Sequence, residues 1–237
     1  MLCNSACGIK GVVALPSLRI VAGVREVVTH LIDDSGSIVA TYAKRAPWPI
    51  GADCAEFEYR SSPGTGITVL DCVGVRIAVQ MCFDVNFSKG WDEIADQGAD
   101  LVLYPSAYPA GFGLRARAWQ SGSMVAAAVL GQGPSPVIES TGEVLARRTS
   151  FDNARPLQVN LNRAIVHRDH QTSHLERFAS CNPIFEFRRL ENDNAVLVTG
   201  PKEGPSVRQA LADAELVELR RYLSKVRHAF SNWGEKR

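Results

Sequence analysis

The sequence has no marked excess of either charge and no long apolar segment. Lysine and arginine total 26 against 25 for aspartate and glutamate, which gives a net charge of +1. This balance favours neither a nucleic acid nor an anionic membrane as a partner, so we expect a small molecule or a second copy of the chain. The apolar run at residues 11–18 is short and contains Pro16, so it is neither a signal-peptide core nor a membrane span. We interpret it as an irregular lead-in to a strand.

Cysteine is sparse, and its spacing is not that of a secreted disulfide scaffold. The sequence also has no internal repeat and no low-complexity tract. These absences favour a globular protein of the reducing cytoplasm. The six cysteines are Cys3, Cys7, Cys54, Cys72, Cys82 and Cys181.

The 237 residues, 46% of them hydrophobic, are sufficient for a substantial core. Short β-rich runs alternate with segments of helical periodicity, which predicts an α/β fold with layered sheets. Expected strands cover residues 19–24, 27–32, 37–42, 75–81, 101–104, 124–130 and 157–161, with helices near 87–95 and 114–121. A long loop over residues 46–66 is rich in proline, glycine, serine and acids, and loops of that length are often functional.

After residue 162 the pattern changes, so we divide the chain into a core (1–162) and a C-terminal extension (163–237). His167, His170 and His174 have the spacing of one helical face, which could hold a metal. Without a cysteine in the group, we expect no metal and favour a solvated or dimer-facing helix. Strand-like runs follow at 185–190 and 195–198.

A long C-terminal helix is predicted to carry one apolar stripe. We expect the stripe to pack on the body of the protein, and a dimer contact is the alternative. The stripe consists of Leu216, Leu219, Leu223, Val226 and Phe230.

Cys82 follows the buried strand predicted at 75–81 and precedes Phe83, Asp84 and a helix. Enzymes of the α/β class often place a nucleophile there, because the helix N-terminus favours a thiolate and offers N–H groups to an oxyanion. The alternative is a buried cysteine acting as a small hydrophobe. Lys44, directly after the strand predicted at 37–42, could likewise be a solvated surface lysine.

Several segments, taken in order, decide between these alternatives: YAK at 42–44, PG at 63–64, GVRIAVQMCFD at 74–84, GADLVLYPSA at 98–107, LRARA at 114–118 and STGEVL at 140–145. Together, over about residues 19–162, they resemble the nitrilase, or carbon-nitrogen hydrolase, superfamily. The resemblance implies a four-layer α-β-β-α sandwich. It also implies a site of cysteine, lysine and glutamate.

By this resemblance Cys82 is the nucleophile, and Lys44 stabilises the oxyanion with the backbone N–H of Phe83. Glu56 is the expected assisting glutamate, with Glu58 as the alternative. We expect the loops around Tyr108, Phe112 and Trp119 to set substrate specificity.

The family's first glutamate, the general base, has no counterpart in this pattern. Glu26 is the only glutamate before Lys44, and its surroundings do not match the motif. The sequence thus suggests an N-terminally incomplete domain. A further departure is Ser88-Lys89, where the family has Pro-Glu.

Two functions follow. The first is a cofactor-free thiol hydrolase, forming a homodimer and acting on nonpeptide carbon-nitrogen bonds of a small amide, carbamoyl compound or nitrile. The second is a catalytically silent or truncated homologue that serves as a binding or assembly subunit.

Overall fold

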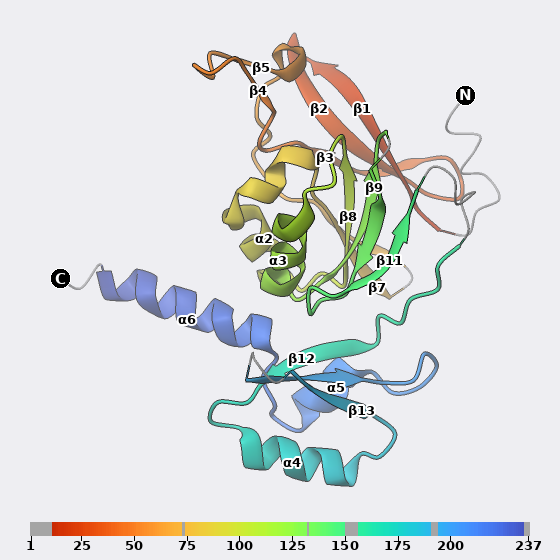
Figure 1. The fold of residues 1–237 in the computed structure, drawn as a ribbon, viewed down its shortest axis with the longest axis vertical. Coiled ribbons are helices and arrows are strands. Elements are labelled where there is room, and N and C mark those ends of the chain that lie inside the picture. The colour runs from red at the N-terminus through yellow and green to blue at the C-terminus, as the bar shows by residue number, and fades with distance from the viewer. Residues whose placement is uncertain (1–10, 73, 132, 150–155, 191–193, 235–237) are drawn as a thin grey trace.

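The computed structural model describes residues 11–72, 74–131, 133–149, 156–190 and 194–234 (Figure 1). Its first sheet is antiparallel, with the order β1-β2-β3. The strands are β1 (Val13–Val21), β2 (Val24–Ile32) and β3 (Ile38–Ala43). β1 begins at Val13, so the expected irregular lead-in over 11–18 is wrong: this segment pairs with β2 from Val13 onward.

A six-stranded sheet with the order β11-β10-β9-β8-β7-β6 forms the centre of the fold. β7, β8 and β9 run parallel, and their connections contain α2 (Ser88–Asp96) and α3 (Gly111–Ser121). This is the β-α-β alternation that the sequence predicts. The strands are β6 (Val69–Cys72), β7 (Val75–Val79), β8 (Leu101–Ser106), β9 (Met124–Val129), β10 (Ser135–Ile138) and β11 (Val144–Arg148).

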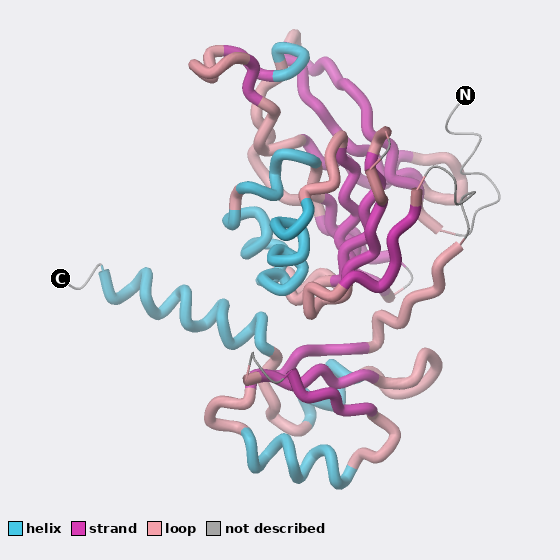
Figure 2. Tube along the Cα trace, viewed as in Figure 1, coloured by secondary structure: helices cyan, strands magenta, loops and turns pink. Residues whose placement is uncertain are grey.

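The two sheets and the two helices form layers, as Figure 2 shows. One core cluster joins Trp91 and Ile94 of α2 and Leu114 of α3 to the central sheet. On the other side of that sheet, Leu31 and Tyr42 pack against Val79, Met81 and Cys82. The fold is therefore mixed α/β, and the described residues form an α-β-β arrangement. A second outer helix layer is not among them.

The loop after β3 is less irregular than its composition suggests. It contains a short antiparallel pair, β4 (Pro49–Ile50) and β5 (Glu56–Phe57), followed by the 3₁₀ turn η1 (Glu58–Arg60). A second 3₁₀ turn, η2 (Cys82–Asn86), connects β7 to α2. These two turns carry Glu58 and Cys82 of the candidate site, and Lys44 directly follows β3.

The C-terminal extension has its own antiparallel sheet, ordered β12-β14-β13. Its elements are β12 (Arg163–His167), α4 (Thr172–Cys181), β13 (Glu186–Leu190), β14 (Ala195–Thr199), α5 (Val207–Asp213) and α6 (Leu219–Gly234). A separate apolar cluster that includes Phe178, Val198 and Leu211 lies inside it. Polar contacts join it to the core: Arg227 pairs with Asp92 and Asp96 of α2, at 3.1 Å each.

Three further expectations about the later part of the chain need correction. Residues 157–161 form no strand; the Asn160 side chain instead donates to the Gly200 carbonyl at 2.8 Å. His167 lies in β12 and His170 has a φ of 61°, so the three histidines do not share a helical face. The apolar stripe packs on the body only in part: Leu219 is buried, whereas Phe230, on the projecting end of α6, is 73% exposed (Figure 1).

No helix among the described residues is both long and apolar enough to cross a lipid bilayer.

Candidate active site

Cys82 is the first residue of η2 and is only 9% exposed. Its φ is 49°, in the left-handed region that residues other than glycine rarely adopt. Such a conformation costs on the order of 1–3 kcal/mol and persists only where its surroundings impose it. A cysteine held this way resembles nucleophiles that sit on a strained strand-to-helix turn.

Three side chains fix the η2 turn by binding its carbonyl groups. Tyr104 Oη donates to the Cys82 oxygen at 2.5 Å, and Trp91 Nε1 donates to the Asp84 oxygen at 3.3 Å. Arg117 Nε donates to the Val85 oxygen at 2.8 Å. These contacts occupy three of the turn's carbonyl groups, whereas no described residue accepts a hydrogen bond from the Phe83 N–H.

Lys44 directly follows β3 and is 2% exposed, so the alternative of a solvated surface lysine is wrong. Its Nζ donates to Glu58 Oε1 at 2.5 Å. The same oxygen accepts from the Trp48 backbone N–H at 2.9 Å. A buried ammonium group needs such a counter-charge, because burial without one is very costly.

Asp84 connects the lysine segment to the cysteine turn. Its carboxylate accepts from the Met81 N–H at 2.9 Å, the Ala46 N–H at 2.8 Å and Tyr42 Oη at 2.7 Å. Burial raises the pKa of Asp84, against the lowering effect of the Tyr42 hydrogen bond. From its place two residues after the cysteine, Asp84 is a possible acid-base group; here its hydrogen bonds hold the turn.

Cys82, Lys44 and Glu58 line one cavity of about 750 Å³ between the two sheets. Its walls are mostly small or apolar: residues 103–107 from β8 and its end, residues 126–130 from β9 and its end, and Ala14, Pro16 and Val27 from the first sheet. Among the described residues that line this cavity, Glu58 is the only carboxylate. The geometry thus brings a thiol, an ammonium group and one carboxylate to a single open cavity.

The structure favours Glu58 over Glu56, the residue expected to assist. Glu56 is exposed in β5, opposite Ile50, and does not line the cavity. The chain leaves β5 at Phe57 and enters η1 at Glu58, where Tyr59 has a φ of 53°, and the Glu58 carboxylate contacts Lys44.

The three aromatic residues expected at the substrate have different surroundings. Tyr108 packs against the cluster that contains Cys82, and its hydroxyl accepts from Asn86 Nδ2 at 3.4 Å. Phe112 is 79% exposed and lines no described cavity. Trp119 packs against Leu219 and other apolar residues of the C-terminal extension, a location that argues against contact with substrate.

The remaining cysteines and histidines form no second centre in the part of the chain described. Cys3 and Cys7 lie outside the described residues, and the other four cysteines are unpaired. Within the described ranges, no group of three or more histidine, cysteine or acidic side chains has the arrangement of a metal site. His167 instead stacks on Tyr222, with ring centroids 4.7 Å apart.

A family model, curated relatives and solved structures all point to one family. The sequence model of the carbon-nitrogen hydrolase family matches residues 28–163. An omega-amidase of Xenopus laevis is 28% identical over 116 residues, which are 42% of this chain and 42% of the relative. A citrullinase of Francisella tularensis is 35% identical over 77 residues, 32% of this chain and 27% of the relative. The matches thus span less than half the length of either curated relative.

A solved structure is also similar. It is a glutamate-to-glutamine mutant of the amidase from Nesterenkonia sp. AN1, carrying the acetamide moiety of fluoroacetamide on its active-site cysteine. The TM-score is 0.53 at 27% identity, over 62% of this chain and 60% of that one.

Proposed function

Because the chain belongs to the carbon-nitrogen hydrolase family, we propose that it hydrolyses the nonpeptide carbon-nitrogen bond of a small amide, with Cys82 as the nucleophile. The observation that supports this most directly is the shared cavity of Cys82, Lys44 and Glu58. A thiol, a buried cation and a carboxylate are the groups that thioester chemistry requires.

The proposed reaction has two halves. Glu58 accepts the thiol proton, and the Cys82 thiolate attacks the amide carbon. The Lys44 ammonium group and the Phe83 N–H stabilise the resulting oxyanion. The carbon-nitrogen bond then breaks, the proton held by Glu58 passes to the leaving nitrogen, and ammonia or an amine departs from a thioester on Cys82.

Water completes the cycle. It attacks the thioester carbon and gives one proton to Glu58, and the carbon-sulfur bond breaks to release the acid. The proton then returns to the Cys82 sulfur. In this scheme Glu58 serves as the base in both halves and also as the counter-charge of Lys44, because no other carboxylate lines the described cavity.

An amide is the substrate class best supported, since the similar proteins include an omega-amidase and an amidase. Carbamoyl compounds and nitriles stay within the proposal, because the same attack on an electrophilic carbon applies to them.

We also propose a homodimer in a reducing cytoplasm. Exposed Phe230 and Trp233 at the end of α6 are consistent with a contact between copies, because large apolar side chains exposed together often mark an interface. Light scattering of the purified protein measures the mass directly. A monomer at micromolar concentration would count against the dimer.

Fluoroacetamide tests the nucleophile. We expect mass spectrometry to find one acetamide adduct at Cys82, and we expect ammonia release from short aliphatic amides that the C82A variant abolishes. C54A is the matched control, because Cys54 is exposed and does not line this cavity. A folded protein with neither adduct nor ammonia release would instead support the silent subunit.

A further inference from the structure

A second cavity, of about 610 Å³, lies beside the candidate active site but shares no lining residue with it. The same three chain segments, 44–45, 57–58 and 80–83, form a wall between the two. Lys44, Glu58, Met81 and Cys82 line the first cavity, whereas their sequence neighbours Arg45, Phe57, Gln80 and Phe83 line the second. A ligand in the second cavity therefore contacts the reverse side of the wall that carries the proposed nucleophile.

Much of the lining of the second cavity is apolar. Six of its 13 lining residues are proline or phenylalanine: Pro47, Pro49, Phe57, Pro63, Phe83 and Phe87. The Phe83 ring packs edge-on against Phe87, with centroids 5.8 Å apart. Burying an aromatic or aliphatic group against such rings is favourable, and the volume is within the range of small-molecule sites.

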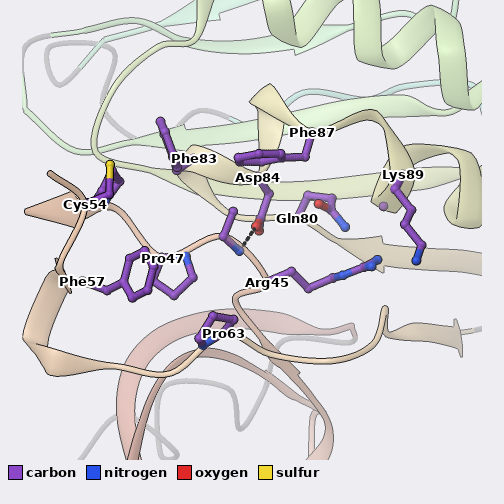
Figure 3. Close-up of a pocket in the computed structure, with 13 residues that line it drawn as sticks. Arg45, Pro47, Cys54, Phe57, Pro63, Gln80, Phe83, Asp84, Phe87 and Lys89 are labelled. Carbon is purple, nitrogen blue, oxygen red and sulfur yellow. Dashed lines mark hydrogen bonds between the residues drawn. The ribbon is translucent and has the colours of Figure 1, made fainter. Parts of the chain in front are cut away.

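Another part of the lining is polar and carries positive charge, as Figure 3 shows for Arg45, Gln80 and Lys89. Gln80 is 1% exposed, and its Nε2 has no hydrogen-bond partner. A buried, unpaired donor is uncommon, since it costs the full desolvation of that group. Gly90 leaves room for this amide: a Cβ there would lie 3.1 Å from Gln80 Nε2.

The charges near this amide favour an anion. Lys89 is exposed and forms no ion pair with any described residue, whereas Arg45 pairs with Glu93 at 2.6 Å. Of the described residues that line this cavity, Asp84 is the only acid, and both of its oxygens already accept hydrogen bonds. An incoming acceptor would therefore meet an N–H donor and a free ammonium group.

From these observations we infer that the second cavity binds a small hydrophobic carboxylate. The apolar body lies among the proline and phenylalanine rings, and the carboxylate accepts from Gln80 Nε2 and pairs with Lys89. The second cavity is lined by none of the Cys82, Lys44 and Glu58 side chains of the proposed mechanism; Phe83 contributes its ring here and its backbone N–H to the proposed oxyanion site.

Calorimetric titration of the full chain with 4-phenylbutyrate tests the site. We expect saturable binding of one molecule, and we expect K89M to weaken it about tenfold through the lost charged contact. K225M is the matched control, because Lys225 is also exposed but lies on α6, and the affinity of this variant for 4-phenylbutyrate should equal that of the wild type. The neutral analogue 4-phenylbutanol should bind at least about tenfold more weakly for the same reason.

Two further variants distinguish this site from the Cys82 cavity. Q80M removes the unpaired donor, so binding should weaken while the melting temperature is unchanged or higher. A128L places a larger side chain at the wall of the Cys82 cavity and should leave binding unchanged. The inference is overturned by no saturation up to about 10 mM, by equal affinity in K89M and wild type, or by loss of binding in A128L alone.

Discussion

Replacing Glu58 with glutamine is the sharpest test of the proposed mechanism, because this one carboxylate has two roles. Glutamine keeps the shape of the side chain and an oxygen that can accept from the Trp48 N–H. It cannot take a proton from Cys82, nor can it neutralise Lys44. The substitution therefore removes charge and basicity and changes little else.

The expected loss of activity follows from the role of a general base. Positioned acid-base groups contribute about 10²–10⁴-fold, so kcat for ammonia release should fall by at least about 10²-fold. That lower bound corresponds to about 2.7 kcal/mol of transition-state stabilisation.

The expected loss of stability follows from burial. The Lys44 side chain is 1% exposed and that of Glu58 is 22% exposed, so removing the acid leaves a buried ammonium group without its partner. Breaking a buried pair costs about 3–5 kcal/mol, and the partial exposure of Glu58 favours the lower end. For a chain of this length, about 3 kcal/mol lowers the melting temperature by about 6–12 °C.

A double variant separates the two effects. K44M/E58Q removes both charges, so most of the lost stability should return while activity stays absent. E56Q is the matched control, since Glu56 is exposed and should tolerate the same substitution without effect. Wild-type ammonia release by E58Q, or an equal loss in E56Q, would refute the assignment of Glu58 as base and counter-charge.

Three further substitutions test the supporting structure. D84N places an amide against three donors and should lower the free energy of unfolding by about 1–3 kcal/mol. Burial raises the folded-state pKa of Asp84, so the contribution of this group to stability is present at low pH and is lost as pH rises from about 4 through that higher pKa. Urea titrations of wild type and D84N at several acidic pH values measure this pH dependence of the free energy of unfolding. A difference between the two proteins that does not change with pH would contradict the prediction. Y104F removes the hydroxyl bound to the Cys82 carbonyl, so the free energy of unfolding should fall by about 0.5–1.5 kcal/mol and iodoacetamide should label Cys82 more slowly. An unchanged labelling rate would exclude a positioning role for Tyr104. W119A should lower stability by about 2 kcal/mol or more without changing KM, and a raised KM with normal stability would restore the substrate role.

Much of the fold follows from local pattern. The strand-helix alternation from residue 75 to 129 is set by apolar periodicity and by the cap at Gly98, and the structure has β7, α2, β8, α3 and β9 in that order. The positions of Lys44 and Cys82 also follow: Lys44 directly succeeds β3, and Cys82 comes three residues after the end of β7, which stops at Val79 and not at the predicted residue 81. The same reasoning predicted a strand at 157–161, and this prediction is wrong. A short apolar-polar run can form a strand, but here the side chain of Asn160 donates to the Gly200 carbonyl.

The identity of the carboxylate could not be predicted in the same way. Glu56 and Glu58 are two residues apart in one loop, and both are compatible with the family pattern. Their difference comes from the φ of 53° at Tyr59 and from the contact with Lys44, fourteen residues away in sequence. Such a turn depends on tertiary packing, so neither propensity nor spacing distinguishes the two acids.

The backbone at Cys82 explains why one wall serves two cavities. In a regular strand Gln80 and Cys82 would point to one side and Met81 and Phe83 to the other, because the side-chain period is two. Instead Met81 and Cys82 line the first cavity, and Gln80 and Phe83 line the second. The alternation breaks at the residue whose φ is 49°, so this strained turn directs the thiol toward Lys44. The same turn leaves the Gln80 amide on the opposite side, where it lacks a partner.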